Sequence, residues 1–193
     1  MMKVKQSKLV WEGDSWRLRV DTLVTPDGTE LDKGFIDHPG AVVLIPVRET
    51  TTEFVKGGSP LEVGTSLEVL MIRQYRRAID EHLLELPAGT REWTEDWLTC
   101  AQRELREETG YRADKIILIG EFWPSPGLSN ELMRLCLATG LHADPLPGDL
   151  DEEIEVMPMP LVKLVDMAKN GQILDAKSIV GLLKAADYLA KQP

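Results

Sequence analysis

The chain has 193 residues, 43% of them hydrophobic, and its 22 basic and 32 acidic side chains give a net charge of −10. A chain of this size and composition has an ample core, and its acidity argues against general nucleic-acid binding, which needs a basic surface. No apolar run approaches membrane-spanning length, and the N-terminal MMKVKQSK lacks the apolar segment of a signal peptide. We therefore expect one cytoplasmic domain with an elaboration, without a membrane or nucleic-acid partner.

The first forty residues predict an antiparallel β extension. Residues 8–25 alternate apolar and polar side chains around a Gly-Asp pair, as in a hairpin, and 31–38 add a strand after the Pro-Asp-Gly turn. Trp11 and Trp16 are expected to pack within the protein; the alternatives are that one stacks on a nucleobase or lines a subunit interface. So few strands are not stable alone, so the extension must pack on its own domain or on a partner.

After residue 40, apolar strands mixed with helical patterns indicate an α+β domain. Residues 41–47, AVVLIPV, suit a buried strand, whereas 48–66 are rich in Thr, Gly, Ser and Pro and are expected to form a surface excursion. The acidic run 151–153 is expected to protect a sheet edge, a second metal site being the alternative. Further strands are expected at 66–76, 115–123 and 131–140, and a last helix at 175–190 with one apolar face formed by Ile179, Leu182, Leu183 and Ala186.

The stretch 89–111, GTREWTEDWLTCAQRELREETGY, concentrates the chemistry. From Glu95 it contains no Pro or Gly until Gly110, which predicts a helix ended by a C-terminal glycine. The residues expected to face the core, at helical spacing, are Leu98, Ala101 and Leu105.

Glu104, Glu107 and Glu108 crowd together on an adjacent face of that helix. Clustered carboxylates repel one another and destabilise the fold unless a cation is present, and all-oxygen ligands suit Mg²⁺ or Mn²⁺. Arg103, four residues before Glu107, is placed to orient that carboxylate. The alternative is a solvated acidic helix face. The terminal glycine, the preceding glycine turn and Glu95 at fixed offsets favour the metal site.

This spacing resembles the Nudix box, with every charged residue and both glycines of that pattern present; Tyr111 replaces the usual aliphatic residue. The resemblance implies a Nudix fold, a mixed β-sheet sandwiched between helices, and metal-dependent hydrolysis of a nucleoside diphosphate linked to another moiety. We expect residues 1–40 to be the β extension and a dimerisation element, and residues 41–193 to be the Nudix hydrolase domain.

Segments around the box resemble those of ADP-ribose pyrophosphatases. The resemblance implies that Arg76 binds a substrate phosphate, that the Ala88 carbonyl is a metal ligand, and that Pro126 matches a proline typical of these enzymes. It also maps their proposed catalytic base onto Glu131, with an ordinary loop carboxylate as the alternative. One departure is Lys33-Gly34, where these enzymes commonly carry an Arg-Glu pair that helps to hold the nucleoside.

The resulting assignment has three parts. The metal ligands are Ala88, Glu104, Glu107 and Glu108; the catalytic residues are Glu107, Glu131 and Arg103; the substrate-binding residues are Arg76, Pro126, Gly127 and Ser129. Either Glu131 or a box glutamate accepts the proton. The expected reaction is Mg²⁺-dependent (or Mn²⁺-dependent) hydrolysis of ADP-ribose to AMP and ribose 5-phosphate by a homodimer. The alternatives are another nucleoside diphosphate sugar, such as GDP-mannose, and a non-catalytic ligand-sensing module.

Overall fold

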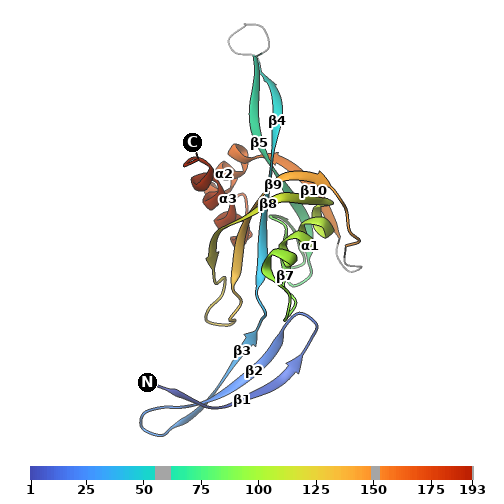
Figure 1. Ribbon diagram of the computed structural model, residues 1–193. Helices are drawn as coiled ribbons and strands as arrows, with labels where there is room; N and C mark the ends of the chain where they lie inside the picture. Colours follow the sequence, from blue (N-terminus) through green and yellow to red (C-terminus); the bar gives the residue numbers. More distant parts are fainter. Residues whose placement is uncertain (55–61, 149–152, 193) are drawn as a thin grey trace.

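A computed structural model of the chain describes residues 1–54, 62–148 and 153–192. In these residues the chain forms a small three-stranded sheet, a larger seven-stranded sheet and helices packed against the latter (Figure 1). The elements, in chain order, are β1 (Lys3–Glu12), β2 (Arg17–Val24), β3 (Glu30–Asp37), β4 (Ala41–Phe54), β5 (Glu62–Arg76), β6 (Glu81–Glu85), β7 (Ala88–Thr90), α1 (Trp97–Thr109), β8 (Tyr111–Phe122), β9 (Met133–Ala143), β10 (Ile154–Pro160), α2 (Leu161–Lys169) and α3 (Ala176–Leu189). No helix in the described ranges is long and apolar enough to cross a membrane.

The larger sheet is mixed and has helices on both faces. Its strand order is β10-β5-β4-β9-β8, with β6 on β5 and β7 on β4, and only the β4–β9 pairing is parallel among these contacts. Along central β4, Val43 and Ile45 belong to the core under α2 and α3, whereas Val42 and Leu44 belong to the core under α1. A strand buried on both faces requires the continuous apolar run seen in the sequence. The predicted α+β fold, a sheet sandwiched between helices, is confirmed.

The described residues of the segment 48–66 do project from the body as expected, but they form paired strands. β4 continues to Phe54 and β5 begins at Glu62, so the two strands form a long antiparallel hairpin that projects from the body (Figure 1). Cross-strand contacts support it, including the Arg48–Glu68 ion pair at 2.9 Å. The threonines that suggested a loop are β-branched and favour a strand. Residues 55–61 lie outside the described part.

Helix faces differ from the expected stripes at two points. Leu98 in the first turn of α1 is 55% exposed, whereas Ala101 and Leu105 are buried as expected. In α3, Leu182 is buried but Leu183 is 37% exposed. The buried face of α3 includes Gly181, where an added Cβ would lie 2.5 Å from Leu86 Cδ1. The glycine therefore lets α3 pack closely against Leu86, which the spacing of apolar residues alone does not reveal.

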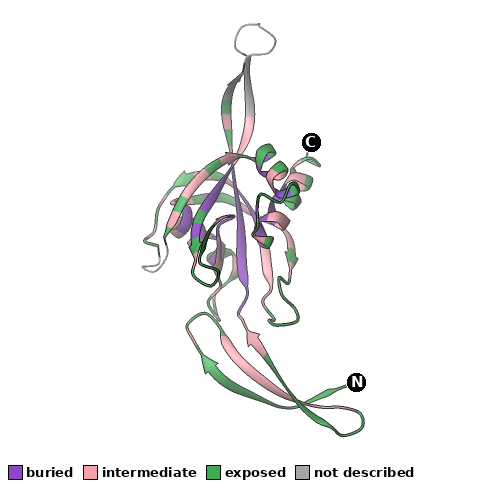
Figure 2. Ribbon diagram, turned by 180° about the vertical axis from the view of Figure 1, so that it is seen from behind, coloured by how far each residue is buried: buried purple, intermediate pink, exposed green. Residues whose placement is uncertain are grey.

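The predicted N-terminal extension is a separate antiparallel sheet, β1-β2-β3, that projects from the body (Figure 1). None of residues 1–37 is buried, and every residue of β1 is exposed (Figure 2). Trp11 and Trp16 contact each other, with ring centroids 4.4 Å apart, but remain 47% and 37% exposed. The acidic run 151–153 precedes β10, an edge strand, but Asp151 and Glu152 lie outside the described residues.

Candidate active site

The turn before the helix is held from both sides. Leu44 N–H donates to the Pro87 carbonyl at 2.8 Å, and Leu86 N–H donates to Ser178 Oγ at 2.6 Å. β7 then pairs with β4 from Ala88 to Thr90. This arrangement fixes the short strand β7 against the central sheet, directly opposite α1.

Helix α1 brings its carboxylates onto β7. Asp96 caps its N-terminus by accepting from two backbone N–H groups, and Gly110 ends it in the left-handed conformation, with φ of 78°. Ala88 N–H donates to Glu108 Oε2 at 2.8 Å. A Cβ on Gly89 would lie 1.8 Å from the Glu104 Cδ, so the absence of a side chain at residue 89 is what admits this carboxylate.

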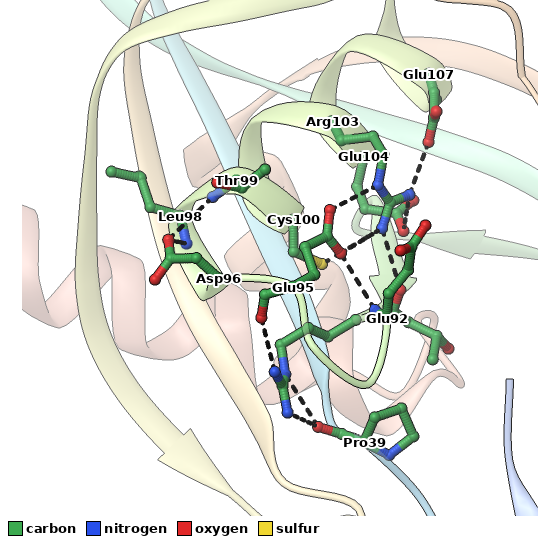
Figure 3. Close-up of polar contacts among 12 residues, drawn as sticks. Pro39, Glu92, Glu95, Asp96, Leu98, Thr99, Cys100, Arg103, Glu104 and Glu107 are labelled. Atoms are coloured by element: carbon green, nitrogen blue, oxygen red, sulfur yellow. Dashed lines mark hydrogen bonds and ion pairs between the residues drawn. The ribbon is translucent and has the colours of Figure 1, made fainter.

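Arg103 lies at the centre of the carboxylate cluster (Figure 3). Its guanidinium donates to Glu95 through Nε and Nη2, both at 2.9 Å, to Glu104 at 2.7 Å, and to Glu107 at 2.9 Å. The predicted Arg103–Glu107 contact is therefore present, and Glu95 also holds the Arg103 guanidinium in place. These hydrogen bonds hold the pKa of Glu95 below its ordinary value and raise that of Arg103, so the ion pairs persist across the neutral range.

The chemistry of this cluster fits a hard divalent cation. Glu104 and Glu108 are only 8% and 5% exposed, all the side-chain donors are carboxylates, and these outnumber the central guanidinium. In the structure as it stands, within the described ranges, no three Asp, Glu, His or Cys side chains form a ready-made cation site. Glu104 and Glu107 are paired with Arg103 instead, so a cation would compete with Arg103 for them.

Two cavities meet at β7. The larger, of about 720 Å³, is lined by the α1 carboxylates, Arg103, the loop between β7 and α1, and the β1–β2 turn. The smaller, of about 410 Å³, lies toward the β5–β6 turn and the start of α3. Both are lined by Arg76 and by residues 88–90 of β7. An extended ligand bound across β7 would therefore contact the carboxylates at one end and the second cavity at the other.

A buried carboxylate holds two cations beside β7. Arg76 donates to both oxygens of Glu85, at 2.8 and 2.6 Å, and Lys177 Nζ donates to the same carboxylate. Although burial opposes ionisation, the bonds from Arg76 and the charge of Lys177 keep the pKa of Glu85 below its ordinary value. Lys177, in the first turn of α3, also pairs with Asp175 at 3.1 Å.

The sequence assigned no role to Lys177 or Glu85. The only hint was a lysine in the first turn of a helix, where the helix dipole disfavours a cation. Lys177 is 7% exposed and pairs with Glu85, which is 1% exposed. Both the burial and the pairing depend on the docking of α3 against the end of β6. Spacing along the chain cannot reveal a contact between residues so far apart in sequence.

Residues of the loop after β8 line two separate cavities. Glu131 lies in the smaller cavity, with its Oε1 3.8 Å from His38 Nε2. Burial raises the pKa of Glu131, and the charge of Lys177 opposes that rise. Pro126, Gly127 and Ser129 instead line a separate cavity of about 270 Å³. The structure thus brings Arg76, Ala88, Arg103 and the α1 glutamates together, places Glu131 next to them, and leaves these other three loop residues apart.

The loop also attaches the N-terminal extension to the body. Ile36 N–H donates to the Leu128 carbonyl at 2.9 Å, and Asn130 N–H donates to the Ile36 carbonyl at 3.2 Å. The Asn130 side chain accepts from His38 N–H at 2.7 Å. This loop, whose composition suggested a role in catalysis, therefore also anchors the N-terminal extension to the body.

The fold is a mixed sheet between helices, and a carboxylate-rich helix faces a glycine turn with the cationic side chains of Arg76 and Lys177 beyond it. This arrangement is suited to metal-assisted chemistry on a diphosphate. The NUDIX domain family model matches residues 61–179, and the chain belongs to this family.

Similar proteins agree with this fold and family. The chain is 28% identical over 192 residues to a methanol dehydrogenase activator of Bacillus methanolicus, covering 98% of this chain and 93% of the relative. It is 29% identical over 171 residues to an ADP-ribose pyrophosphatase of Bacillus subtilis, covering 88% and 84%. A crystal structure of an ADP compounds hydrolase matches with a TM-score of 0.74 and 18% identity, over 98% of this chain and 94% of that chain, which shows a shared fold.

Proposed function

We propose that this Nudix pyrophosphatase hydrolyses ADP-ribose to AMP and ribose 5-phosphate with Mg²⁺ as its metal. The observation that carries the proposal is the position of β7, with the α1 carboxylates in one cavity, Lys177 in the other and Arg76 lining both. Relatives from Bacillus subtilis and Mycobacterium tuberculosis, aligned over 88% and 92% of this chain, are ADP-ribose pyrophosphatases. Their alignments extend beyond the family domain, which favours this substrate.

The cation would be held by Glu104, Glu107, Glu108 and the Ala88 carbonyl. When bound, Mg²⁺ supplies Lewis-acid polarisation of the diphosphate oxygens. Arg103 then has a positioning role, because it already fixes Glu95, Glu104 and Glu107 in one hydrogen-bonded group. Its pairs must exchange with the cation when the latter binds.

Arg76 and Lys177 bind the diphosphate oxygens from the other side of β7. Glu85 keeps both cations side by side, and the planar guanidinium of Arg76 suits oxygens of a phosphate. Water adds to one phosphorus, the bridging P–O bond breaks, and the bridging oxygen leaves with the other phosphate.

A carboxylate must accept the proton released by the attacking water. Glu107 is held by Arg103 through an ion pair at 2.9 Å, so its carboxylate is already engaged by a cation. Glu131 has a pKa raised by burial and is not paired with an arginine in the described structure. A base is more effective when its pKa approaches the working pH, so Glu131 is the better acceptor.

GDP-mannose is a second candidate substrate. The chain is 36% identical over 121 residues to a GDP-mannose pyrophosphatase of Cronobacter sakazakii, but the match covers 58% of this chain and 63% of that relative. The higher identity thus applies to a shorter segment. A ligand-sensing role without catalysis would not explain the carboxylate cluster.

One turnover assay separates these functions. Purified protein is incubated with Mg²⁺ and a panel of ADP-ribose, GDP-mannose and other nucleoside diphosphate sugars, and nucleoside monophosphate is quantified. The proposal predicts the highest kcat/KM with ADP-ribose. A preference for GDP-mannose would support the second candidate, and no turnover of any compound would refute an enzymatic role on nucleotide sugars.

We further propose that residues 1–40 are a dimerisation element and residues 41–193 the hydrolase domain of a cytoplasmic homodimer. The support is that no residue of 1–37 is buried and that this arm exposes large apolar side chains to solvent. Such surfaces are typical of protein contacts. The exposed apolar side chains of its strands and turns include Val4, Leu9, Val10, Trp11, Trp16 and Leu31.

A further inference from the structure

The β1–β2 turn reaches the catalytic cavity of its own chain. Asp14 and Ser15, at the tip of the turn, line the 720 Å³ cavity together with Glu104, Glu107 and Glu108. In Figure 1 this turn lies at the end of the N-terminal sheet nearest the body, whereas the β2–β3 turn lies at the far end. An exposed arm thereby contributes two polar residues to a site formed otherwise by the hydrolase domain.

A specific contact holds the turn in this position. The guanidinium of Arg17, the first residue of β2, lies over the Trp93 ring at 4.0 Å from its centroid. Arg17 Nε also donates to Glu12 at 2.7 Å across the same turn. Trp93 belongs to the loop between β7 and α1 and lines the same cavity. The cation–π contact therefore joins the turn to the catalytic loop within one chain.

The chemistry of this part of the cavity suits hydroxyl groups. Asp14 and Glu92 supply carboxylates and Ser15 and Thr94 supply hydroxyls, all on the cavity lining. Arg103 lines it too, but its donors are directed to glutamates. Acceptor-rich surroundings repel a phosphate and accept hydrogen bonds from a sugar diol.

We propose that the β1–β2 turn of each chain, through Asp14 and Ser15, binds sugar hydroxyls of the nucleoside diphosphate sugar held in that same chain's cavity. The inference rests on the proposed function and adds a specificity element to it, supplied in cis. The phosphates lie toward Arg76, and a hydroxyl-bearing ribose or hexose lies toward Asp14.

The first test measures hydroxyl recognition. The variants are Asp14→Ala and Ser15→Ala, and the matched control is Asp27→Asn, an exposed turn acid at the opposite end of the same sheet. Substrates are ADP-ribose and its 2′-deoxy and 2″-deoxy analogues, which remove one hydroxyl from either ribose. We expect Asp14→Ala to raise KM for ADP-ribose about tenfold or more with kcat little changed, as for a lost hydrogen bond to a charged group.

Discrimination between ADP-ribose and its deoxy analogues tests hydroxyl binding directly, because a purely structural role of Asp14 would leave this discrimination unchanged. Wild type and Asp27→Asn should prefer ADP-ribose over one of its two deoxy analogues, and Asp14→Ala should lose that preference. Equal discrimination in all variants, with a normal wild-type turnover, would overturn the inference while leaving the proposed function intact. Absence of nucleotide-sugar turnover by the wild type would instead overturn the proposed function, and this inference with it.

The second test decides between contributions in cis and in trans. Asp14→Ala is mixed in equal amounts and refolded with Glu108→Gln, which has an intact turn but an inactivated box, and activity is measured at ADP-ribose concentrations well below KM, where Asp14→Ala alone is impaired. If the turn serves its own chain, no site in a mixed dimer has both parts intact, and activity stays at the average of the two variants. If the turn serves a partner subunit, mixed dimers recover about a quarter of the wild-type activity, which would overturn the cis assignment.

Discussion

At the scale of single residues, the site depends on how charges are paired. One guanidinium, Arg103, restrains Glu95, Glu104 and Glu107, while one buried carboxylate, Glu85, restrains two cations. The acidic and basic groups thus form two networks on either side of β7. We assign a divalent cation as the ligand of the first network and a diphosphate as the ligand of the second.

We expect Glu107→Gln or Glu108→Gln to lower kcat by about 100-fold or more while the fold remains intact. An amide keeps the acceptor oxygen that binds Ala88 N–H but loses the charge that a cation requires. Circular dichroism checks folding and steady-state kinetics check turnover, with exposed Glu155→Gln in β10 as the control. Near-wild-type rates for both variants at saturating Mg²⁺ would remove the metal assignment.

The pH dependence of the rate distinguishes the two candidate bases. A base acts only as the carboxylate, so with Glu131 as base the rate rises with pH through its pKa, which burial places above the ordinary value of 4.5. Glu131→Gln should lower kcat and abolish this acidic limb of the profile. A profile and rate that survive the substitution would transfer the role of base to Glu107.

At the scale of elements, the capped helix α1 and the turn before it could be predicted because their determinants are local. Asp96, Gly110 and the glutamate spacing act within one segment of chain. The exposure of Leu98 and Leu183 and the strand pairing within the β4–β5 hairpin were not predicted, because docking against distant elements decides which helix face is buried and whether a polar segment pairs. The same reason hid Lys177 and Glu85, whose contact depends on the packing of α3 against β6.

Divalent metal should stabilise the protein by linking α1 to β7. At a Mg²⁺ concentration about 100 times Kd, mass action raises Tm by about 5–10 °C for a chain of this size. Thermal melts with EDTA and with Mg²⁺ measure the shift, KCl at matched ionic strength controls for screening, and a Glu104→Gln/Glu108→Gln variant should lack it. Identical melting curves, with no Mg²⁺ or Mn²⁺ binding by calorimetry, would favour a solvated acidic helix.

At the scale of the whole molecule, two projections extend from one body, the N-terminal sheet and the β4–β5 hairpin (Figure 1). The core lies in the larger sheet, and the N-terminal sheet has no buried residue (Figure 2). Hydrogen bonds of Ile36, Asp37 and His38 with the loop after β8, and the contact of Arg17 with Trp93, join it to the body. A second subunit would cover the apolar side chains that this arm exposes.

Light scattering of the full-length protein at micromolar concentration should therefore give the mass of a dimer. Deletion of residues 1–37 should yield monomers with a raised KM, because both the apolar arm and the Asp14 turn are lost while α1 is intact. A monomer mass for the full-length chain would refute the dimerisation role of the extension.

The central claim is that the box carboxylates and a divalent cation cleave the diphosphate of ADP-ribose. It is tested most directly by incubating ADP-ribose in ¹⁸O-labelled water with wild type, wild type plus EDTA, and Glu108→Gln, and analysing the products by mass spectrometry. We expect AMP and ribose 5-phosphate with one ¹⁸O in one product from wild type and Mg²⁺, and almost none from the other two. Equal product formation in all three reactions, or intact ADP-ribose in the first, would contradict it.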